Sequence, residues 1–68
     1  MDRNFTKEYI EISNAFRSSK GSKIAAEKLF DLLYDVENSN RTKADNITLS
    51  NIYGLLGFHE SAYMVFKA

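Results

Sequence analysis

The sequence predicts an all-α fold, a small bundle of helical hairpins with three main helices and a short C-terminal helix. Apolar residues recur at steps of three and four in segments that end at a glycine or in a polar stretch, which is typical of amphipathic helices. Proline is absent, and the alternation typical of strands has little support. A chain of 68 residues forms at most one small domain. We expect a single helical domain over 1–68, with a hairpin over 5–37, a loop over 38–46 and a hairpin over 47–68.

The first helix is predicted to run from Phe5 to Ser19, because one apolar stripe continues along this segment. Asn4 or Asp2 can cap its start. Gly21 is expected to supply the left-handed residue that ends the helix. The stripe consists of Phe5, Tyr9, Ile12 and Phe16.

The second helix follows Ser22, which is a good N-cap residue. Its apolar face is wide enough to suggest contacts on more than one side, so part of this face is expected to bind a partner. The predicted partner-binding residues are Leu29, Phe30, Leu33 and Tyr34.

The stretch over 38–46 has no apolar residue larger than alanine and reads as a loop. Asp45, Asn46 or Thr48 is expected to cap the third helix, which Gly57 should end with a sharp turn. Phe58 should fold back over this turn, and the last helix should begin near His59. The two predicted facing stripes are Leu49, Ile52, Tyr53 and Leu56 on the third helix, and Ala62, Val65 and Phe66 on the fourth.

The two halves echo each other, since Ser13-Asn14-Ala15-Phe16 matches Ser50-Asn51-Ile52-Tyr53 at a shift of 37 residues. In each half a glycine is followed by a small residue after five positions and by an aromatic one after nine. This pattern resembles the tetratricopeptide repeat over residues 12–30 and 49–68, which implies helical hairpins.

The C-terminal stretch also resembles the second helix-turn-helix of AraC-type activators, through Ile52, Leu56, Gly57, Phe58, Glu60, Ser61 and Tyr63. This resemblance implies a DNA-binding regulator as the alternative function. The DNA-reading residues would be His59, Ser61 and Lys67. The sequence departs from the family by having Tyr53 at a site where a small residue is usual, and by lacking the arginines that meet phosphates.

A third resemblance is to small negative regulators of AraC-type activators, which are helical proteins of about this length. It rests on the stretch from Ala25 to Phe30, where Phe30 stands in place of a usual tryptophan. The resemblance implies binding to an activator protein and no catalytic site.

The composition limits the classes of function. Nine basic residues balance nine acidic ones, so the chain lacks the excess of positive charge with which proteins neutralise phosphates. Cysteine is absent and there is one histidine, so neither disulfides nor a zinc site is expected. The carboxylates of Asp31 and Asp35 lie one turn apart without a histidine or third carboxylate to support catalysis. We therefore expect no enzymatic activity, no cofactor and no metal.

Partner chains remain as the means to stabilise so small a core. We expect binding to another protein or to a second copy, with a homodimer as the self-associated form. No signal peptide or membrane-spanning segment is evident, which favours the cytoplasm. The predicted function is that of a non-enzymatic regulatory protein that acts by protein–protein binding, with antagonism of a transcription activator as the role that the resemblance implies.

Overall fold

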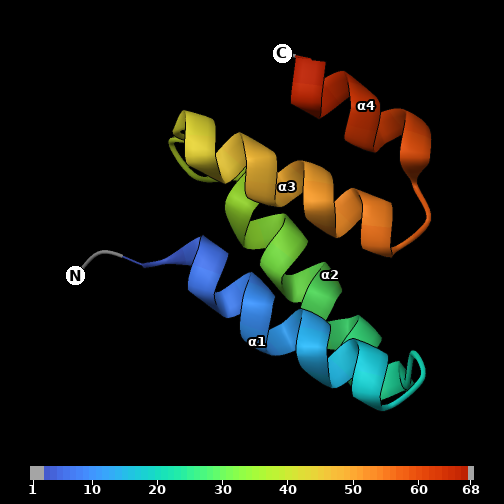
Figure 1. Ribbon diagram of the computed structural model, residues 1–68. Coiled ribbons are helices and arrows are strands. Elements are labelled where there is room, and N and C mark those ends of the chain that lie inside the picture. Colours follow the sequence, from blue (N-terminus) through green and yellow to red (C-terminus); the bar gives the residue numbers. More distant parts are fainter. Residues whose placement is uncertain (1–2, 68) are drawn as a thin grey trace.

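The computed structural model describes residues 3–67, which form four helices and no strand (Figure 1). The prediction of an all-α fold with three main helices and a short fourth one is confirmed. The helices are α1 (Phe5–Ser18), α2 (Lys23–Glu37), α3 (Lys43–Leu55) and α4 (His59–Lys67).

The core lies among α1, α2 and α3, and α4 packs on α3 alone (Figure 1). The molecule measures 32 × 30 × 15 Å. The buried members of the core are Phe5, Leu29, Leu32, Val36, Leu49 and Ile52.

A part-buried pair of hydroxyl groups connects α1 to α3. The Oγ1 atoms of Thr6 and Thr48 lie 3.0 Å apart, and Thr48 is buried. Ser13, which is also buried, donates its hydroxyl hydrogen to the carbonyl oxygen of Ile10. Both buried hydroxyls are therefore hydrogen-bonded, as polar groups in a protein interior need to be.

The start of α1 is fixed to α2 by Arg3. Its guanidinium lies 2.6 Å from a carboxylate oxygen of Glu8 and 2.8 Å from one of Asp35, and it covers the ring of Phe5 at 4.9 Å. Hydrogen bonds to the two carboxylates raise the pKa of Arg3, which keeps its charge at every relevant pH. Asn4 caps the helix by accepting from the backbone N–H of Lys7, as predicted.

The turn after α1 differs from the prediction in one respect. The left-handed residue directly after the C-cap is Lys20, with a φ of 55°, and Gly21 follows with a φ of 76°. The N–H of Gly21 donates to the carbonyl of Phe16 and that of Lys20 to the carbonyl of Arg17, which is the Schellman pattern. Gly21 thus takes the second position of the motif, and Lys20 takes the position that glycine usually fills. Ser22 then caps α2 as predicted.

The loop between the hairpins is shorter than predicted, and all three expected caps of α3 are wrong. Thr42 is the N-cap, because its hydroxyl accepts from the N–H of Asp45 while the Asp45 carboxylate accepts from the N–H of Thr42. This reciprocal pair is a capping box. The first turn of α3 is polar, so its start could not be located from the apolar stripe, which begins later in the helix.

The turn after α3 agrees with the prediction. Gly57 has a φ of 91°, and the N–H of Phe58 donates to the carbonyl of Tyr53 in a second Schellman motif. The ring of Phe58 meets that of Tyr53 edge to face, with 6.3 Å between the centroids. Phe58 therefore folds back over the joint as expected, although 47% of its surface stays exposed.

The predicted facing stripes of α3 and α4 are wrong in part. Leu49 and Ile52 are fully buried, but they belong to the core with α1 and α2. Val65 is the α4 residue that packs against this core, and Ser50 of α3 donates to the carbonyl oxygen of Ala62. Phe66, which was assigned to the stripe, is 68% exposed. The reason is that α3 already uses its apolar stripe against the first hairpin.

Candidate protein-binding surfaces

The outer side of α2 carries two exposed aromatic residues one turn apart. Phe30 is 47% exposed and Tyr34 is 68% exposed. Leu33, next to them, is half-buried and packs against the core. We call Phe30, Leu33 and Tyr34 the α2 surface. Its aromatic rings combine a large apolar area with low side-chain entropy, as is common at protein interfaces.

Leu29 was predicted to belong to this surface, but it is fully buried in the core. At about 100° per residue, Leu29 and Phe30 project in different directions from the helix. The broad apolar face of α2 is therefore divided between the core and the solvent. The sequence showed the width of the face but not which of its residues the other helices cover.

Three acidic residues lie beside the α2 surface, and Lys23 lies on the same face of the helix two turns before Phe30. Helical neighbours lie three and four positions apart, which places Glu27 beside Phe30, and Asp31 and Glu37 beside Tyr34. Glu37 also accepts a hydrogen bond from the hydroxyl of Tyr53 on α3. This bond, together with burial, raises the pKa of Tyr53 above its ordinary value of 10.0. The α2 surface thus combines aromatic contact area with a negatively charged rim.

The three residues of the DNA-binding alternative, His59, Ser61 and Lys67, are all exposed and all on α4. They do not share one face, because His59 and Ser61 are about 200° apart around the helix axis. Ser61 instead lines a hollow between α3 and α4 together with Val65. The exposed side of α4 also carries Glu60, whose charge would repel a phosphate backbone.

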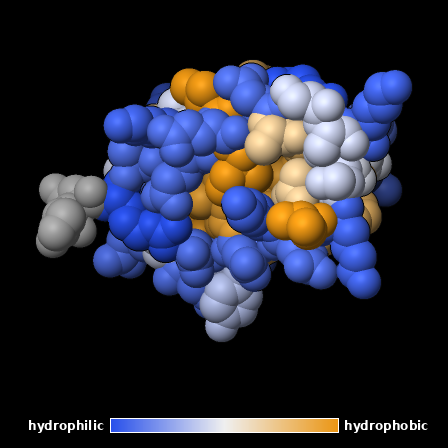
Figure 2. All heavy atoms as spheres, turned by 90° about the horizontal axis from the view of Figure 1, so that it is seen from below, coloured by the Kyte–Doolittle hydropathy of each residue, from blue (hydrophilic) through white to orange (hydrophobic). Residues whose placement is uncertain are grey.

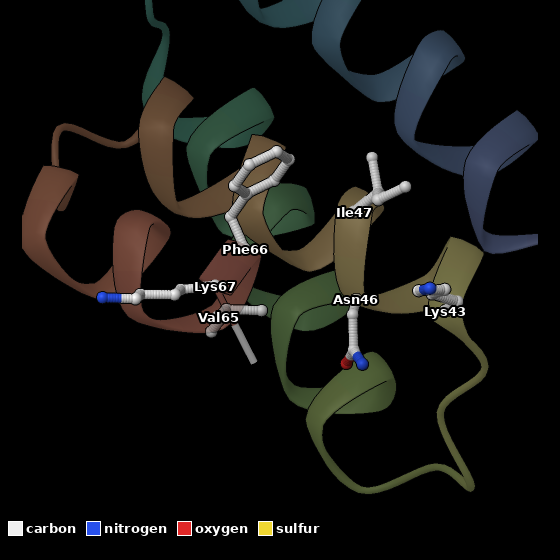
Figure 3. A pocket seen from close by; sticks show the side chains of 6 residues that line it. All are labelled: Lys43, Asn46, Ile47, Val65, Phe66 and Lys67. Atoms are coloured by element: carbon white, nitrogen blue, oxygen red, sulfur yellow. The ribbon is translucent and has the colours of Figure 1, made fainter.

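A hollow of about 420 Å³ lies between the start of α3 and the end of α4 (Figure 3). Ile47 and Phe66 extend along one side of it, and both are about half exposed or more. Lys43 and Lys67 stand at opposite sides, and the Lys67 ammonium lies 5.7 Å from the ring of Tyr63. The two positive charges therefore do not converge on a common anion.

The sequence interpretation missed most of the apolar surface of α4. Tyr63, Met64 and Phe66 are 61%, 67% and 68% exposed, and no residue of this helix is buried. A signal was present, because five consecutive apolar residues over 62–66 span more than one helical turn and cannot all face α3. The face over α1 and α2 is different, since it is mostly hydrophilic around a central hydrophobic band (Figure 2).

The two carboxylates one turn apart on α2 have different surroundings. The carboxylate of Asp35 is paired with Arg3, and Asp31 lies exposed beside it on α2. Within residues 3–67, no group of three or more histidine, cysteine, aspartate or glutamate side chains is placed to hold a metal ion. None of the helices over these residues has the length and apolar character needed to cross a membrane.

Comparisons of the chain with family models, with curated proteins and with solved structures find no match. Function is therefore inferred from the surfaces of the chain itself.

Proposed function

We propose that this protein is a non-enzymatic regulator that binds another protein through the α2 surface. The observation that carries the proposal is the exposure of Phe30 and Tyr34, one turn apart on the longest helix of the fold. Aromatic residues are enriched at protein interfaces, and tyrosine is among the residue types that most often dominate their binding free energy.

The rim of the surface specifies the chemistry of the partner. Glu27, Asp31 and Glu37 present negative charge around the two aromatic rings. A complementary partner presents an apolar patch framed by lysine or arginine, since opposite potentials across an interface favour association and exclude wrong partners. The DNA-binding domain of a transcription activator has such a basic surface. An antagonist that covers this domain fits the resemblance at residues 25–30.

DNA binding by the chain itself has less support. His59 and Ser61 project from different sides of α4, and Glu60 lies on its exposed side. The balanced charge of the chain also offers little for contact with phosphates.

The test compares two charge substitutions on the same helix. We expect Phe30→Asp to weaken binding to a purified AraC-type DNA-binding domain from the same organism by roughly tenfold or more. Ile24→Asp is the matched control, because Ile24 is 70% exposed but lies about 120° around the helix from Phe30. Biolayer interferometry at two salt concentrations gives both affinities, and circular dichroism checks that the variants fold.

The result that supports the proposal is binding that weakens with Phe30→Asp and with added salt and is unchanged by Ile24→Asp. Equal binding by wild type and Phe30→Asp would show that the α2 surface is the wrong one. No binding to any such domain would remove the activator as partner. A mobility-shift titration tests the alternative, and tight, salt-sensitive, sequence-selective DNA binding by the wild type would replace protein binding as the function.

A further inference from the structure

The outer side of α4 lacks a covering element within the described chain. Five consecutive apolar residues over 62–66 span more than one turn of the helix, so they cannot all face α3. Here α4 packs on α3 alone, and Val65 is its one contact with the core cluster. Helices shorter than about 12–15 residues are marginal without tertiary packing, and α4 has nine. Its exposed side therefore stands to gain stability from a further contact.

Four residues of α4 form one stripe on this exposed side. Glu60, Tyr63, Met64 and Lys67 are spaced by three, four and seven positions, so they line one face of the helix. All four are exposed. The stripe begins with a negative charge and ends with a positive one, and its two large apolar residues lie at the centre. We call these four residues the α4 stripe.

The order of these residues makes the stripe complementary to itself. We infer that the α4 stripe binds a second copy of this chain, with the two α4 helices antiparallel about a two-fold axis between Tyr63 and Met64. This axis places Glu60 of each copy against Lys67 of the other, at both ends of the contact. It also places Tyr63 of each copy against Met64 of the other, where sulfur and ring make a favourable contact. A two-fold interface requires such self-complementarity.

The surface next to the stripe has room for the opposing ring. A hollow of about 440 Å³ is lined by Tyr53 of α3 and by Glu60, Ser61, Met64 and Val65 of α4. In the antiparallel pair, Tyr63 of one copy faces Met64 of the other. Because Met64 lines the hollow, the Tyr63 ring of one copy lies next to the hollow of the other. Insertion of a side chain into a hole on the facing helix is the usual packing between paired helices.

The parallel arrangement is disfavoured by charge. It would bring Glu60 against Glu60 and Lys67 against Lys67, and like charges across an interface oppose association. The contact of two nine-residue helices is small, so we expect a dimer of micromolar or weaker affinity. The dimer uses α4, whereas the proposed function uses α2. Failure of one proposal would therefore leave the other untouched.

Sedimentation velocity from low micromolar to millimolar concentration tests the dimer. We expect the wild type to pass from a monomer of 7.8 kDa to a dimer as the concentration rises. Glu60→Lys and Lys67→Glu should each weaken the dimer by roughly tenfold or more, because each places like charges at both ends of the antiparallel contact. Met64→Asp should abolish it.

Mixing the two charge variants distinguishes the antiparallel register from a general loss of structure. A Glu60→Lys chain paired with a Lys67→Glu chain has opposite charges at both ends, so the mixture should form a heterodimer that neither variant forms alone. Tyr34→Asp, on the α2 surface, is the matched control and should leave the dimer unchanged. A wild type that stays monomeric at millimolar concentration would overturn the inference. So would single variants that dimerise normally, a mixture without recovery, or a dimer that Tyr34→Asp disrupts.

Discussion

The hairpin of α1 and α2 and the hairpin of α3 and α4 reverse the chain with the same backbone pattern. The N–H of Gly21 donates to Phe16 in the first, and the N–H of Phe58 donates to Tyr53 in the second, at the same shift of 37 residues that relates the two sequences. The hairpins differ in the burial of their second helix. Helix α2 contributes four buried residues, and α4 contributes none.

The conformation of the turn and the burial of the helix that follows it therefore have different causes in this molecule. The turn depends on local backbone hydrogen bonds, and both halves satisfy them. Burial depends on whether other helices surround the second helix of the hairpin. Helix α2 lies against both α1 and α3, whereas α4 has α3 only. The same local design thus gives a core helix in one half and a surface helix in the other.

Truncating the core contact of each second helix should separate the two hairpins most clearly. Leu29→Ala in α2 should lower the free energy of unfolding by about 2–5 kcal/mol, because Leu29 is fully buried. Val65→Ala in α4 should cost about 1 kcal/mol, since Val65 is half-buried and loses less contact. Urea denaturation of both variants measures the difference. Equal losses would mean that α4 is as much part of the core as α2.

The next effect in size concerns the second turn. Gly57→Val should lower the free energy of unfolding by about 1–2 kcal/mol, because a β-branched residue is strained at a φ of 91°. A Cβ atom there meets no atom within 4 Å, so the expected loss comes from the backbone angle. Thermal melts decide this prediction. Gly54→Ala is the control, because Gly54 is helical with open space around it and the substitution should stabilise α3.

A substitution in the turn between α1 and α2 should stabilise the protein, in contrast to Gly57→Val. Lys20→Gly is expected to raise the free energy of unfolding by about 0.5–1 kcal/mol, because glycine adopts a φ of 55° without strain. The greater conformational entropy that glycine loses on folding offsets part of this gain. Lys20→Ala keeps the strain and removes the charge, so it should change stability little. If both substitutions stabilise the protein equally, the charge rather than the backbone angle is the cause.

The smallest expected change in stability concerns the hydrogen bond between Tyr53 of α3 and Glu37 of α2, which joins the two hairpins. Tyr53→Phe removes the hydrogen bond to Glu37 and should cost roughly 0.5 kcal/mol or less at neutral pH, since the bond is exposed. The folded protein raises the pKa of Tyr53, so this contribution is complete below pH 10.0 and is lost as the pH rises through the raised pKa. Urea melts of both proteins at neutral pH and well above pH 10.0 should therefore differ at the first pH and converge at the second.

The class of fold, the turn at Gly57, and the N-caps of α1 and α2 were all predictable from the sequence alone. These features depend on neighbours within a few positions, where residue type and spacing carry the physics. The capping box of Thr42 and Asp45 was equally local and was readable from two residues three positions apart. The expected caps lay too far along the chain, because the apolar stripe begins after the polar first turn of α3.

The burial of individual apolar side chains, by contrast, was settled by tertiary packing. Leu29 and Phe30 are adjacent and both apolar, yet one is fully buried and the other is 47% exposed. On α4, Val65 is half-buried against the core, whereas its neighbour Phe66 is 68% exposed. Periodicity shows that a helix has an apolar face, but the width of the face that is covered depends on how many helices pack around it. That number is set by contacts between distant parts of the chain, which no local pattern contains.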